Sequence, residues 1–458
     1  MQLFREEKDS IGTLSVPEQA YYGVQTLRGY NNFQITGEKM EPVFIYNIAK
    51  IKKAAAIANA KAGSISSSTA DAIVKACDEV ICGKFDGEFI TDAIQGGAGT
   101  TVNMNVNEVV ANRATELVGG KRGEYLVHPN DAVNCAQSTN DVIPSAGKLT
   151  LLDLFSPMEE KLNALIDALD EKAVEFDRVI KMGRTQLQDA VPVRLGQEFS
   201  AFSAALKRDR ARISASVESM KVLNLGGTAI GTSINVADGY IENVYPVLSQ
   251  ITGYSLKPAD NLIDSTQNLD AFADFSASLK TFALDLIKIC NDLRLMSSGP
   301  RAGLEEIFLP AMQNGSSIMP GKVNPVIPEV VTQVAYNVIG NDLTVSLSIQ
   351  AGQFELNPYE PVIFFKLFES LKTLTGALDT FTVNCVKGIK ANEEHLKELV
   401  SFSTGTVTAL APMLGYQKAA DIAKEAIKRG MSIKSILLEK KIFIEKEIDK
   451  ILDPFSMT

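Results

Sequence analysis

The chain of 458 residues contains only two histidines, His128 and His395, and no His-Glu-x-x-His segment. Histidine is the side chain that most readily changes charge near neutral pH, so acid and base chemistry must rest mainly on other groups. The absence of His-Glu-x-x-His also excludes a zinc protease of that type. We expect His128 to be structural or peripheral, and His395 to lie on a solvated helix face.

The cysteines do not suit a disulfide framework or a zinc site, because they are odd in number, scattered and without a C-x-x-C pair. They are Cys77, Cys82, Cys135, Cys290 and Cys385. Residues 1–9 mix acidic and basic side chains and lack the apolar stretch of a signal peptide. We therefore expect reduced thiols and a cytoplasmic protein.

The chain also lacks long apolar runs and a positive net charge. No run approaches the roughly 18 residues that a membrane span requires. The formal net charge is -10, whereas nucleic-acid binding depends on basic groups that neutralise phosphates. We expect neither a membrane nor a nucleic acid as a partner.

Apolar residues return every three or four positions through the middle of the sequence, which predicts long helices. The clearest stripe comprises Phe272, Phe275, Leu279, Phe282, Leu286, Ile289, Leu293 and Met296. A second comprises Leu195, Phe199, Phe202, Leu206, Ile213, Val217 and Met220. Three further patterns cover about 149–179, with an interruption near Pro157, 328–345 and 361–383. These five stripes predict a mainly α protein with a central bundle of long helices.

Three segments follow from this pattern. We expect a mixed, mainly helical domain over 1–140, a five-helix bundle over 141–391 and a small helical domain over 392–458. The stripes of the bundle carry more apolar length than a compact monomer readily hides. We therefore expect the bundle to assemble with other copies of the chain.

Four polar stretches interrupt the helical patterns and are rich in hydroxyls, amides and glycine. They are residues 99–103, 137–141, 183–189 and 315–325. Taken singly, each suits an ordinary helix cap, a surface loop or a solvated lysine. Taken together, they offer many neutral donors and a cation beside a serine pair. That combination is suited to a small dicarboxylate.

The segment GSSIMPGKVNP at 315–325 resembles the signature of the fumarase and aspartase superfamily. Further segments resemble the same superfamily in the same order and cover nearly the whole chain. They are REEKDSIG, VPEQAYYGVQTLRGYNNF, GGAGTTVNMNVNEV, HPNDAVNCAQSTND, MGRTQLQDAVP, SSGPRAGLEE and GYQKAADIAKEA. The resemblance implies a three-domain fold, a homotetramer whose core is the central bundle, and active sites that each draw on three chains.

Three positions favour the aspartase branch of this superfamily. Gln186 follows Gly-Arg-Thr where fumarases usually have His, and Thr139 stands where fumarases tend to have a second Ser. Glu360 precedes a proline where fumarases tend to have Lys. The resemblance then implies reversible elimination of ammonia from L-aspartate to give fumarate. Two alternatives stay open: a fumarase that expels water, and a catalytically silent homologue with a structural role.

The resemblance makes Ser316 the base that removes the Cβ proton, with an enediolate as the intermediate. The implied substrate-binding residues are Thr100, Ser138, Thr139, Asn140, Thr185, Gln186, Ser317, Lys322 and Asn324. Lys322, Asn324 and Thr185 would hold the α-carboxylate. Ser138, Thr139 and Ser317 would hold the β-carboxylate, and Thr100, Asn140 and Gln186 would face the amino group.

Serine is a weak base unless its alkoxide is stabilised. Backbone N–H groups of the glycine-containing loop and the charge of Lys322 are the expected sources of that stabilisation. Closure of the loop over the substrate would exclude water. The resemblance implies no required cofactor and no metal site, although divalent cations activate some relatives.

Overall fold

The computed structural model describes residues 3–458, and these residues form a mainly helical protein with four short two-stranded sheets. Contacts within the chain divide it into two compact units. Unit 1 comprises the described chain up to Met158, with Ala211–Thr281 and Asn337–Thr373. Unit 2 comprises Glu159–Arg210, Phe282–Tyr336 and Leu374–Thr458. The predicted boundaries at 140/141 and 391/392 stay a prediction.

Five long helices follow the five predicted stripes. They are α5 (Thr139–Glu175), α6 (Leu195–Val217), α9 (Asp270–Met296), α10 (Val326–Gln350) and α11 (Glu360–Asn384). Every residue of the two clearest stripes is buried. A stripe buried along its whole length is the pattern expected of a helix in a bundle, which confirms the predicted mainly α fold.

Helix α5 is continuous where the sequence predicts an interruption near Pro157, because it passes through both Pro144 and Pro157. A proline has no N–H to donate to the carbonyl four residues earlier. For Pro144 that carbonyl belongs to Asn140, and it accepts a hydrogen bond from Asn224 Nδ2 at 3.0 Å instead. A side chain of unit 1 therefore takes over the hydrogen bond that the helix loses at Pro144.

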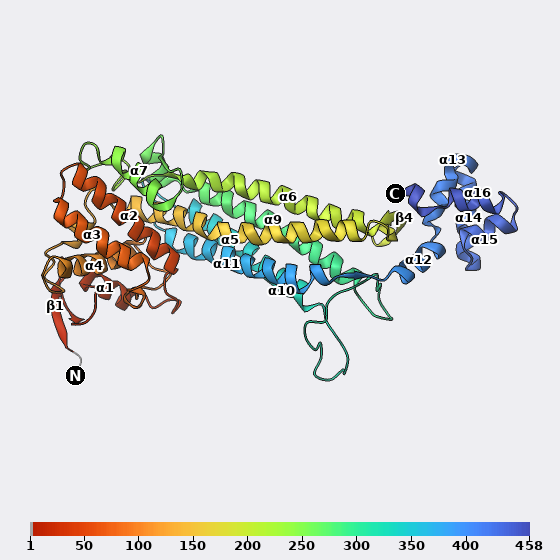
Figure 1. Cartoon of the computed structure of the whole chain (residues 1–458), viewed down its shortest axis with the longest axis horizontal. Helices are drawn as coiled ribbons and strands as arrows, with labels where there is room; N and C mark the ends of the chain where they lie inside the picture. The colour runs from red at the N-terminus through yellow and green to blue at the C-terminus, as the bar shows by residue number, and fades with distance from the viewer. Residues whose placement is uncertain (1–2) are drawn as a thin grey trace. The chain divides into compact units, whose positions relative to one another are not determined.

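The remaining elements of unit 1 are short helices and small sheets. They are β1 (Phe4–Lys8), β2 (Thr13–Pro17), α1 (Val24–Asn32), α2 (Pro42–Lys61), α3 (Ser67–Ile81), α4 (Thr100–Leu117), β5 (Val222–Leu223), α7 (Tyr240–Thr252), β6 (Lys257–Pro258) and α8 (Leu262–Gln267). Helix α2 packs against both α3 and α7, and α4 packs against α1 and α3 (Figure 1). Helices α1 to α4 lie in the segment over 1–140 that the sequence predicts to be mainly helical.

The apolar core of unit 1 is built on phenylalanines. Phe364 lies with its ring centroid 5.5 Å from that of Phe44 and 5.3 Å from that of Phe272. The α5 backbone comes close to this cluster at Gly147, where an added Cβ would lie 2.3 Å from the Phe364 ring. Such tight packing fixes the first half of α5, whose N-terminal residues carry part of the predicted site.

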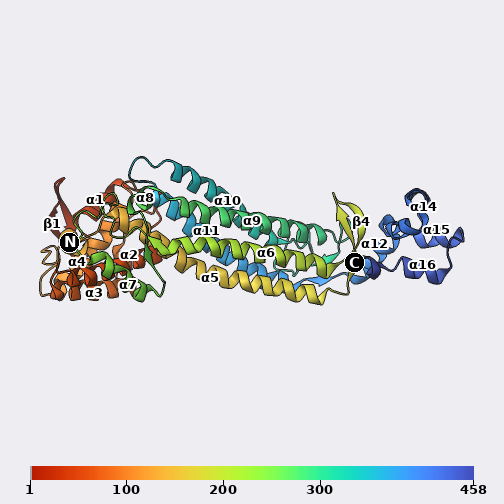
Figure 2. The same ribbon diagram turned by 90° about the horizontal axis from the view of Figure 1, so that it is seen from above.

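Unit 2 contains a hairpin and a group of short helices near the C-terminal end of the chain. The elements are β3 (Ile180–Thr185), β4 (Gln188–Arg194), β7 (Ile307–Phe308), β8 (Lys390–Ala391), α12 (Glu393–Phe402), α13 (Ala411–Leu414), α14 (Tyr416–Arg429), α15 (Ile433–Glu439) and α16 (Glu445–Ile451). Helices α14, α15 and α16 lie together (Figure 2). They enclose a small apolar core that includes Ile422, Ile436 and Ile448.

None of the helices within 3–458 is both long and apolar enough to cross a membrane. This agrees with the short apolar runs of the sequence.

Candidate active site

Four polar residues form the turn that opens helix α5. The Asp141 carboxylate accepts a hydrogen bond from Ser138 N at 2.9 Å, and it also accepts bonds from Gly226 N at 2.9 Å and Thr228 N at 3.1 Å. Asp141 is fully buried. Burial raises the pKa of Asp141 to about 6, against the lowering effect of these three bonds. The Asp141 carboxylate therefore connects the turn at Ser138 to the loop that contains Gly226 and Thr228.

The hydrogen bonds of this turn decide which atoms remain for a ligand. Ser138 Oγ accepts a bond from Asn140 N at 3.2 Å, so its hydroxyl hydrogen is free to point elsewhere. Asn140 Nδ2 donates to the Ala229 carbonyl at 2.7 Å. A carbonyl can only accept, so the Asn140 side chain must present Oδ1, an acceptor, on its other side.

Thr139 shares a hydrogen bond with helix α4. Asn103 Nδ2 lies 3.3 Å from Thr139 Oγ1 and donates to it, which again leaves the hydroxyl hydrogen of Thr139 for another partner. Thr100 lies one helical turn before Asn103 and hence on the same face of α4. Its hydroxyl donates to the Gly97 carbonyl at 2.7 Å and can only accept from a ligand. Unit 1 therefore brings Thr100, Ser138, Thr139 and Asn140 into one region.

Thr185 and Gln186 lie at the tip of the β3–β4 hairpin in unit 2. Thr185 pairs with Gln188, so Gln186 and Leu187 form the two-residue turn, with backbone φ of +53° and +63°. Positive φ at both central positions is the turn that matches the twist of a hairpin. The Gln186 side chain is exposed at this tip. The hairpin presents a neutral amide, not a proton donor that ionises near neutral pH.

The base of this hairpin is held by buried charges. Glu306 is fully buried and lies 2.6 Å from Arg184 and 2.8 Å from Lys181. Lys181 also contacts the Glu198 carboxylate at 3.0 Å. Removing one partner of such a group would leave an unpaired buried charge. The two cations flank Gly183 and fix the strand that carries Thr185.

Ser316 lies in the loop of residues 315–325, also in unit 2. Its Oγ accepts hydrogen bonds from two backbone groups, Ile318 N at 3.2 Å and Met319 N at 3.0 Å. Two N–H dipoles aimed at one hydroxyl oxygen stabilise negative charge there. The expectation that backbone N–H groups support a serine alkoxide therefore has a direct geometric counterpart.

The two ends of the loop are tied together. Gly315 N donates to the Lys322 carbonyl at 2.7 Å, and Asn324 Nδ2 donates to the Gly315 carbonyl at 2.8 Å. A Cβ at position 315 would lie 2.7 Å from the Lys322 oxygen, so this close approach requires glycine. Ser317 and Lys322 are exposed. Among the described residues, neither side chain has a hydrogen bond to Ser316 or to the β3–β4 hairpin.

A cavity of about 600 Å³ in unit 1 is lined by Thr100, Arg28 and His128 among others. His128 Nδ1 accepts a hydrogen bond from Asp131 N at 3.2 Å. The histidine lines the same cavity as Thr100 and has no hydrogen bond to the Ser138–Asn140 turn within 3–458, so its structural or peripheral role stays a prediction. His395 differs from expectation, because its Nε2 lies 3.0 Å from the Leu304 carbonyl and the side chain is half-buried.

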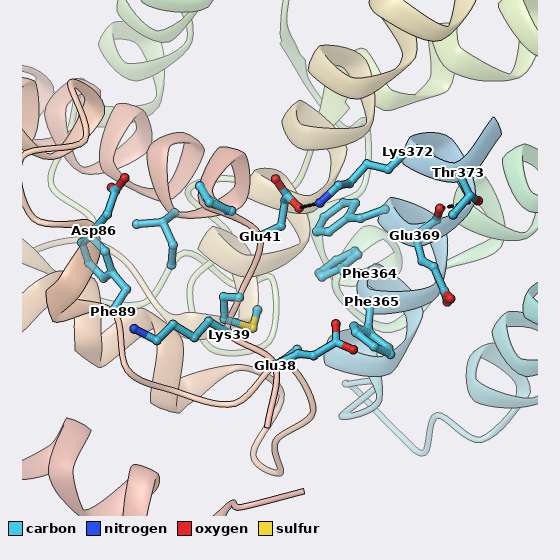
Figure 3. A pocket seen from close by; sticks show the side chains of 15 residues that line it. Glu38, Lys39, Glu41, Asp86, Phe89, Phe364, Phe365, Glu369, Lys372 and Thr373 are labelled. Carbon is cyan, nitrogen blue, oxygen red and sulfur yellow. Dashed lines mark hydrogen bonds and ion pairs between the residues drawn. The ribbon is translucent and has the colours of Figure 1, made fainter. Parts of the chain in front are cut away.

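A second cavity of unit 1, of about 510 Å³, does not include the predicted residues of this unit. Figure 3 shows the phenylalanines of α11 on one side of it, with Phe364 and Phe365 labelled. Lys372 reaches across to Glu41, with Nζ 2.6 Å from Oε2. The cavity combines apolar walls with a partly exposed ion pair, and its lining has no group of serines and amides suited to a dicarboxylate.

Comparison with known protein families gives two matches. Residues 12–340 match the family described as Lyase, and residues 407–458 match the family described as Fumarase C C-terminus. The first match covers more than half of the chain.

Curated relatives and solved structures extend over almost the full length. Aspartate ammonia-lyase of Helicobacter pylori strain J99 is 52% identical over 456 residues, which cover 99% of this chain and 97% of the relative. Aspartate ammonia-lyase of Bacillus subtilis strain 168 is 50% identical over 456 residues, 99% of this chain and 96% of the relative.

Two solved structures have the same fold. The fumarate lyase:delta crystallin of Brucella melitensis, bound to cobalt, superposes with a TM-score of 0.97 at 47% identity and 99% coverage of both chains. The class II fumarase of Schistosoma mansoni has a TM-score of 0.96 at 38% identity, again with 99% coverage of both chains.

Proposed function

The chain belongs to the fumarase and aspartase family of lyases, and we propose that it splits L-aspartate into fumarate and ammonia by serine-base chemistry. Full-length relatives that are about half identical in sequence carry the name aspartate ammonia-lyase, which supports a carbon–nitrogen lyase. The class II fumarase has lower identity at 38%. The expected assignment to the aspartase branch therefore agrees with its relatives.

The single structural observation that carries the proposal is the donor and acceptor pattern in unit 1. Ser138 and Thr139 each have a hydroxyl hydrogen to donate, while Asn140 Oδ1 and the Thr100 hydroxyl are left to accept. Donors suit a carboxylate, and acceptors suit an ammonium group. L-aspartate carries both, whereas L-malate has no ammonium group.

The proposed reaction starts at Ser316. Its alkoxide, stabilised by Ile318 N and Met319 N, takes a proton from Cβ of aspartate and becomes a hydroxyl. The electron pair moves into the β-carboxylate, which becomes an enediolate. Stabilising that second negative charge is the largest task, and fixed donors such as Ser138 and Thr139 are suited to it.

Collapse of the enediolate breaks the Cα–N bond. The bonding pair leaves with nitrogen, so an ammonium substituent departs as neutral ammonia and fumarate remains. This leaving group needs no strong general acid, which suits the neutral Gln186 at the hairpin tip. In this scheme Ser317 assists at the β-carboxylate, while Thr185, Lys322 and Asn324 bind the α-carboxylate.

We also propose that the active protein is a homotetramer whose sites combine loops of three chains. Helix α10 leaves Tyr336, Leu343 and Leu347 more than half exposed, and such an apolar row is suited to burial against another copy. Leu343→Glu should lower the tetramer fraction in sedimentation velocity and lower the activity in parallel. Ile427→Glu, at an exposed position of helix α14, is the control expected to remain tetrameric. An active monomer would rule out the shared site.

The test of the reaction uses the purified protein with L-aspartate and, separately, with L-malate while fumarate absorbance is followed. Release of fumarate from aspartate, with much slower release from malate, supports the proposal. Turnover of malate alone would make the chain a fumarase. Well-folded tetramer without either activity would support the catalytically silent alternative.

No required cofactor and a cytoplasmic location are further parts of the proposal, which leaves activation by divalent cations open. Buried Cys77, Cys290 and Cys385 suit a reducing compartment. Within 3–458, no three His, Cys, Asp or Glu side chains lie close enough to hold a metal ion. Cation dependence is therefore best tested directly, by adding Mg²⁺ or chelator to the aspartate assay.

A further inference from the structure

A buried network of amide side chains lies behind the Ser138–Asn140 turn. One backbone carbonyl determines which atoms of the network donate hydrogen bonds and which accept them. Asn134 Nδ2 lies 3.2 Å from the Gln137 carbonyl, which can only accept. The Asn134 amide must therefore direct Nδ2 toward Gln137 and Oδ1 the opposite way. This assignment is fixed by the main chain and does not depend on any charge.

Three donors converge on Asn134 Oδ1 from two helices. Lys52 Nζ of α2 lies at 2.8 Å, and Asn107 Nδ2 and Asn103 Nδ2 of α4 lie at 3.1 and 3.3 Å. Lys52, Asn103 and Asn107 are all almost completely buried. Because Asn134 Oδ1 can only accept, Asn103 must present its Nδ2 to it.

The same Nδ2 of Asn103 also faces Thr139 Oγ1 at 3.3 Å. One hydrogen of Nδ2 points to Asn134 and the other to Thr139. A rotated Asn103 amide could accept from the Thr139 hydroxyl, but it would place its oxygen against the Asn134 oxygen. Thr139 must therefore accept from Asn103, and its own hydrogen is directed away from the network.

The network also leaves acceptors unused. Within the described chain, Asn103 Oδ1 and Asn107 Oδ1 are buried without a hydrogen-bond partner. If the Asn103 amide were reversed, its Oδ1 would accept a hydrogen bond from the Thr139 hydroxyl. The need of this oxygen for a hydrogen-bond partner therefore does not explain the observed orientation. The orientation is imposed by Asn134, whose own amide is oriented by the Gln137 carbonyl.

We propose that Asn103 and Asn134 are positioning residues that make Thr139 a dedicated hydrogen-bond donor to the substrate carboxylate. This inference rests on the proposed function and adds residues to it that do not touch the substrate. A hydroxyl that cannot turn inward is already oriented when charge develops on the enediolate. Such preorganised donors stabilise a transition state without reorganising during the reaction.

The test is a double-mutant cycle between positions 103 and 139. Asn103→Asp replaces the donor by a carboxylate, which can only accept when ionised and so turns the Thr139 hydroxyl inward. Thr139→Val removes the hydroxyl and keeps the shape. Asn107→Asp is the matched control, because Asn107 contacts Asn134 from the same helix but does not contact Thr139.

In the otherwise unchanged protein, we expect Thr139→Val to lower kcat for aspartate by about 10²-fold, as for a lost donor to developing charge. In the Asn103→Asp background the same substitution should lower kcat by less than about 3-fold, because the donor is already lost. In the Asn107→Asp background the large loss should persist. A purely structural role would give similar Thr139→Val losses in all three backgrounds and would overturn the inference.

The controls distinguish a folding defect, and a failure of the proposed function, from a failure of the positioning role. Melting temperature and oligomer size are measured for every variant. If Asn103→Asp does not fold, Asn103→Leu replaces it, and a Thr139→Val loss that is still undiminished overturns the inference. If the unchanged protein does not release fumarate from aspartate, the proposed function fails. If the protein turns over aspartate but the effects of the substitutions at positions 103 and 139 are additive, the positioning role is wrong and the proposed function stands.

Discussion

Lys52 and Asp141 are both fully buried in unit 1, and the charge of each favours the ionised form of the other. Burial is nevertheless the larger effect on both groups. It lowers the pKa of Lys52 to about 7 and raises the pKa of Asp141 to about 6. Both residues belong to the structure behind the Ser138–Asn140 turn, so their titration concerns the site as well as the stability.

The first prediction is that this pair gives a minimum of stability between pH 6 and 7. The folded protein binds a proton at Asp141 more tightly than the unfolded chain, so stability falls as pH rises from about 4 to 6. It binds a proton at Lys52 less tightly, so stability rises again from about pH 7 toward 10. At about 1.4 kcal/mol per pKa unit, the total change in the free energy of unfolding should amount to roughly 3 kcal/mol for Asp141 and roughly 5 kcal/mol for Lys52.

Chemical unfolding midpoints at a fixed protein concentration, measured across this pH range, check the prediction. Lys52→Met should remove the alkaline change and raise the pKa of Asp141 further, because the cation that favours its carboxylate is gone. Lys52→Met with Asp141→Asn should remove both changes. An unchanged pH profile in the double variant would show that neither group titrates in this range.

The second prediction concerns Ser316. Ser316→Ala should lower kcat by about 10²- to 10⁴-fold, the contribution expected of a general base. The side chain is small and half-buried in its loop, so melting temperature and oligomer size should change little. Ser317→Ala is the matched control, with a smaller effect expected because Ser317 binds substrate and does not take the proton. Near-normal turnover of Ser316→Ala would remove it from the role.

The third prediction is that Lys322→Ala mainly raises the aspartate concentration needed for half-maximal rate. Lys322 is exposed, and within the described residues its ammonium group has no hydrogen bond to Ser316. A cation that binds the α-carboxylate equally in the ground state and transition state changes KM and leaves kcat. Steady-state kinetics decide this, and an effect confined to kcat would instead place Lys322 at the developing charge.

The fourth prediction tests the acceptor assigned to Asn140. Asn140→Ala should raise KM for aspartate by roughly 10-fold, because its Oδ1 no longer accepts from the ammonium group. Inhibition by succinate, a dicarboxylate without an amino group, should change by less than about 2-fold. Thr139→Val should weaken both. Equal weakening of succinate and aspartate by Asn140→Ala would show that Asn140 binds a carboxylate.

The sequence predicts the helices of the bundle well, because a buried stripe repeats along each of them. It also identifies the superfamily through Ser316 and the surrounding loop. The Ser138-x-x-Asp141 spacing is a helix-capping pattern, and it could have identified Asp141 as the residue that pins the turn. Residues 137–141 suit a helix cap as a polar stretch, and the prediction did not extend to the carboxylate of Asp141.

The network behind Thr139 could not be predicted from the sequence. Lys52, Asn103 and Asn134 belong to three separate elements, and a buried lysine looks like any solvated lysine in a one-dimensional pattern. Contacts between distant segments create the network. Pro157 is a case of a wrong prediction. The sequence predicts an interruption of the helix there, whereas α5 continues through this residue in the folded chain.

The two N–H groups that face Ser316 belong to the main chain, and this makes the strength of the base a property of the loop's shape. No neighbouring side chain needs to change for the serine to lose its basicity. A loop that relaxes and turns Ile318 N and Met319 N away would leave an ordinary alcohol, with every residue of the site intact. Ordering of residues 315–325 would then activate the enzyme.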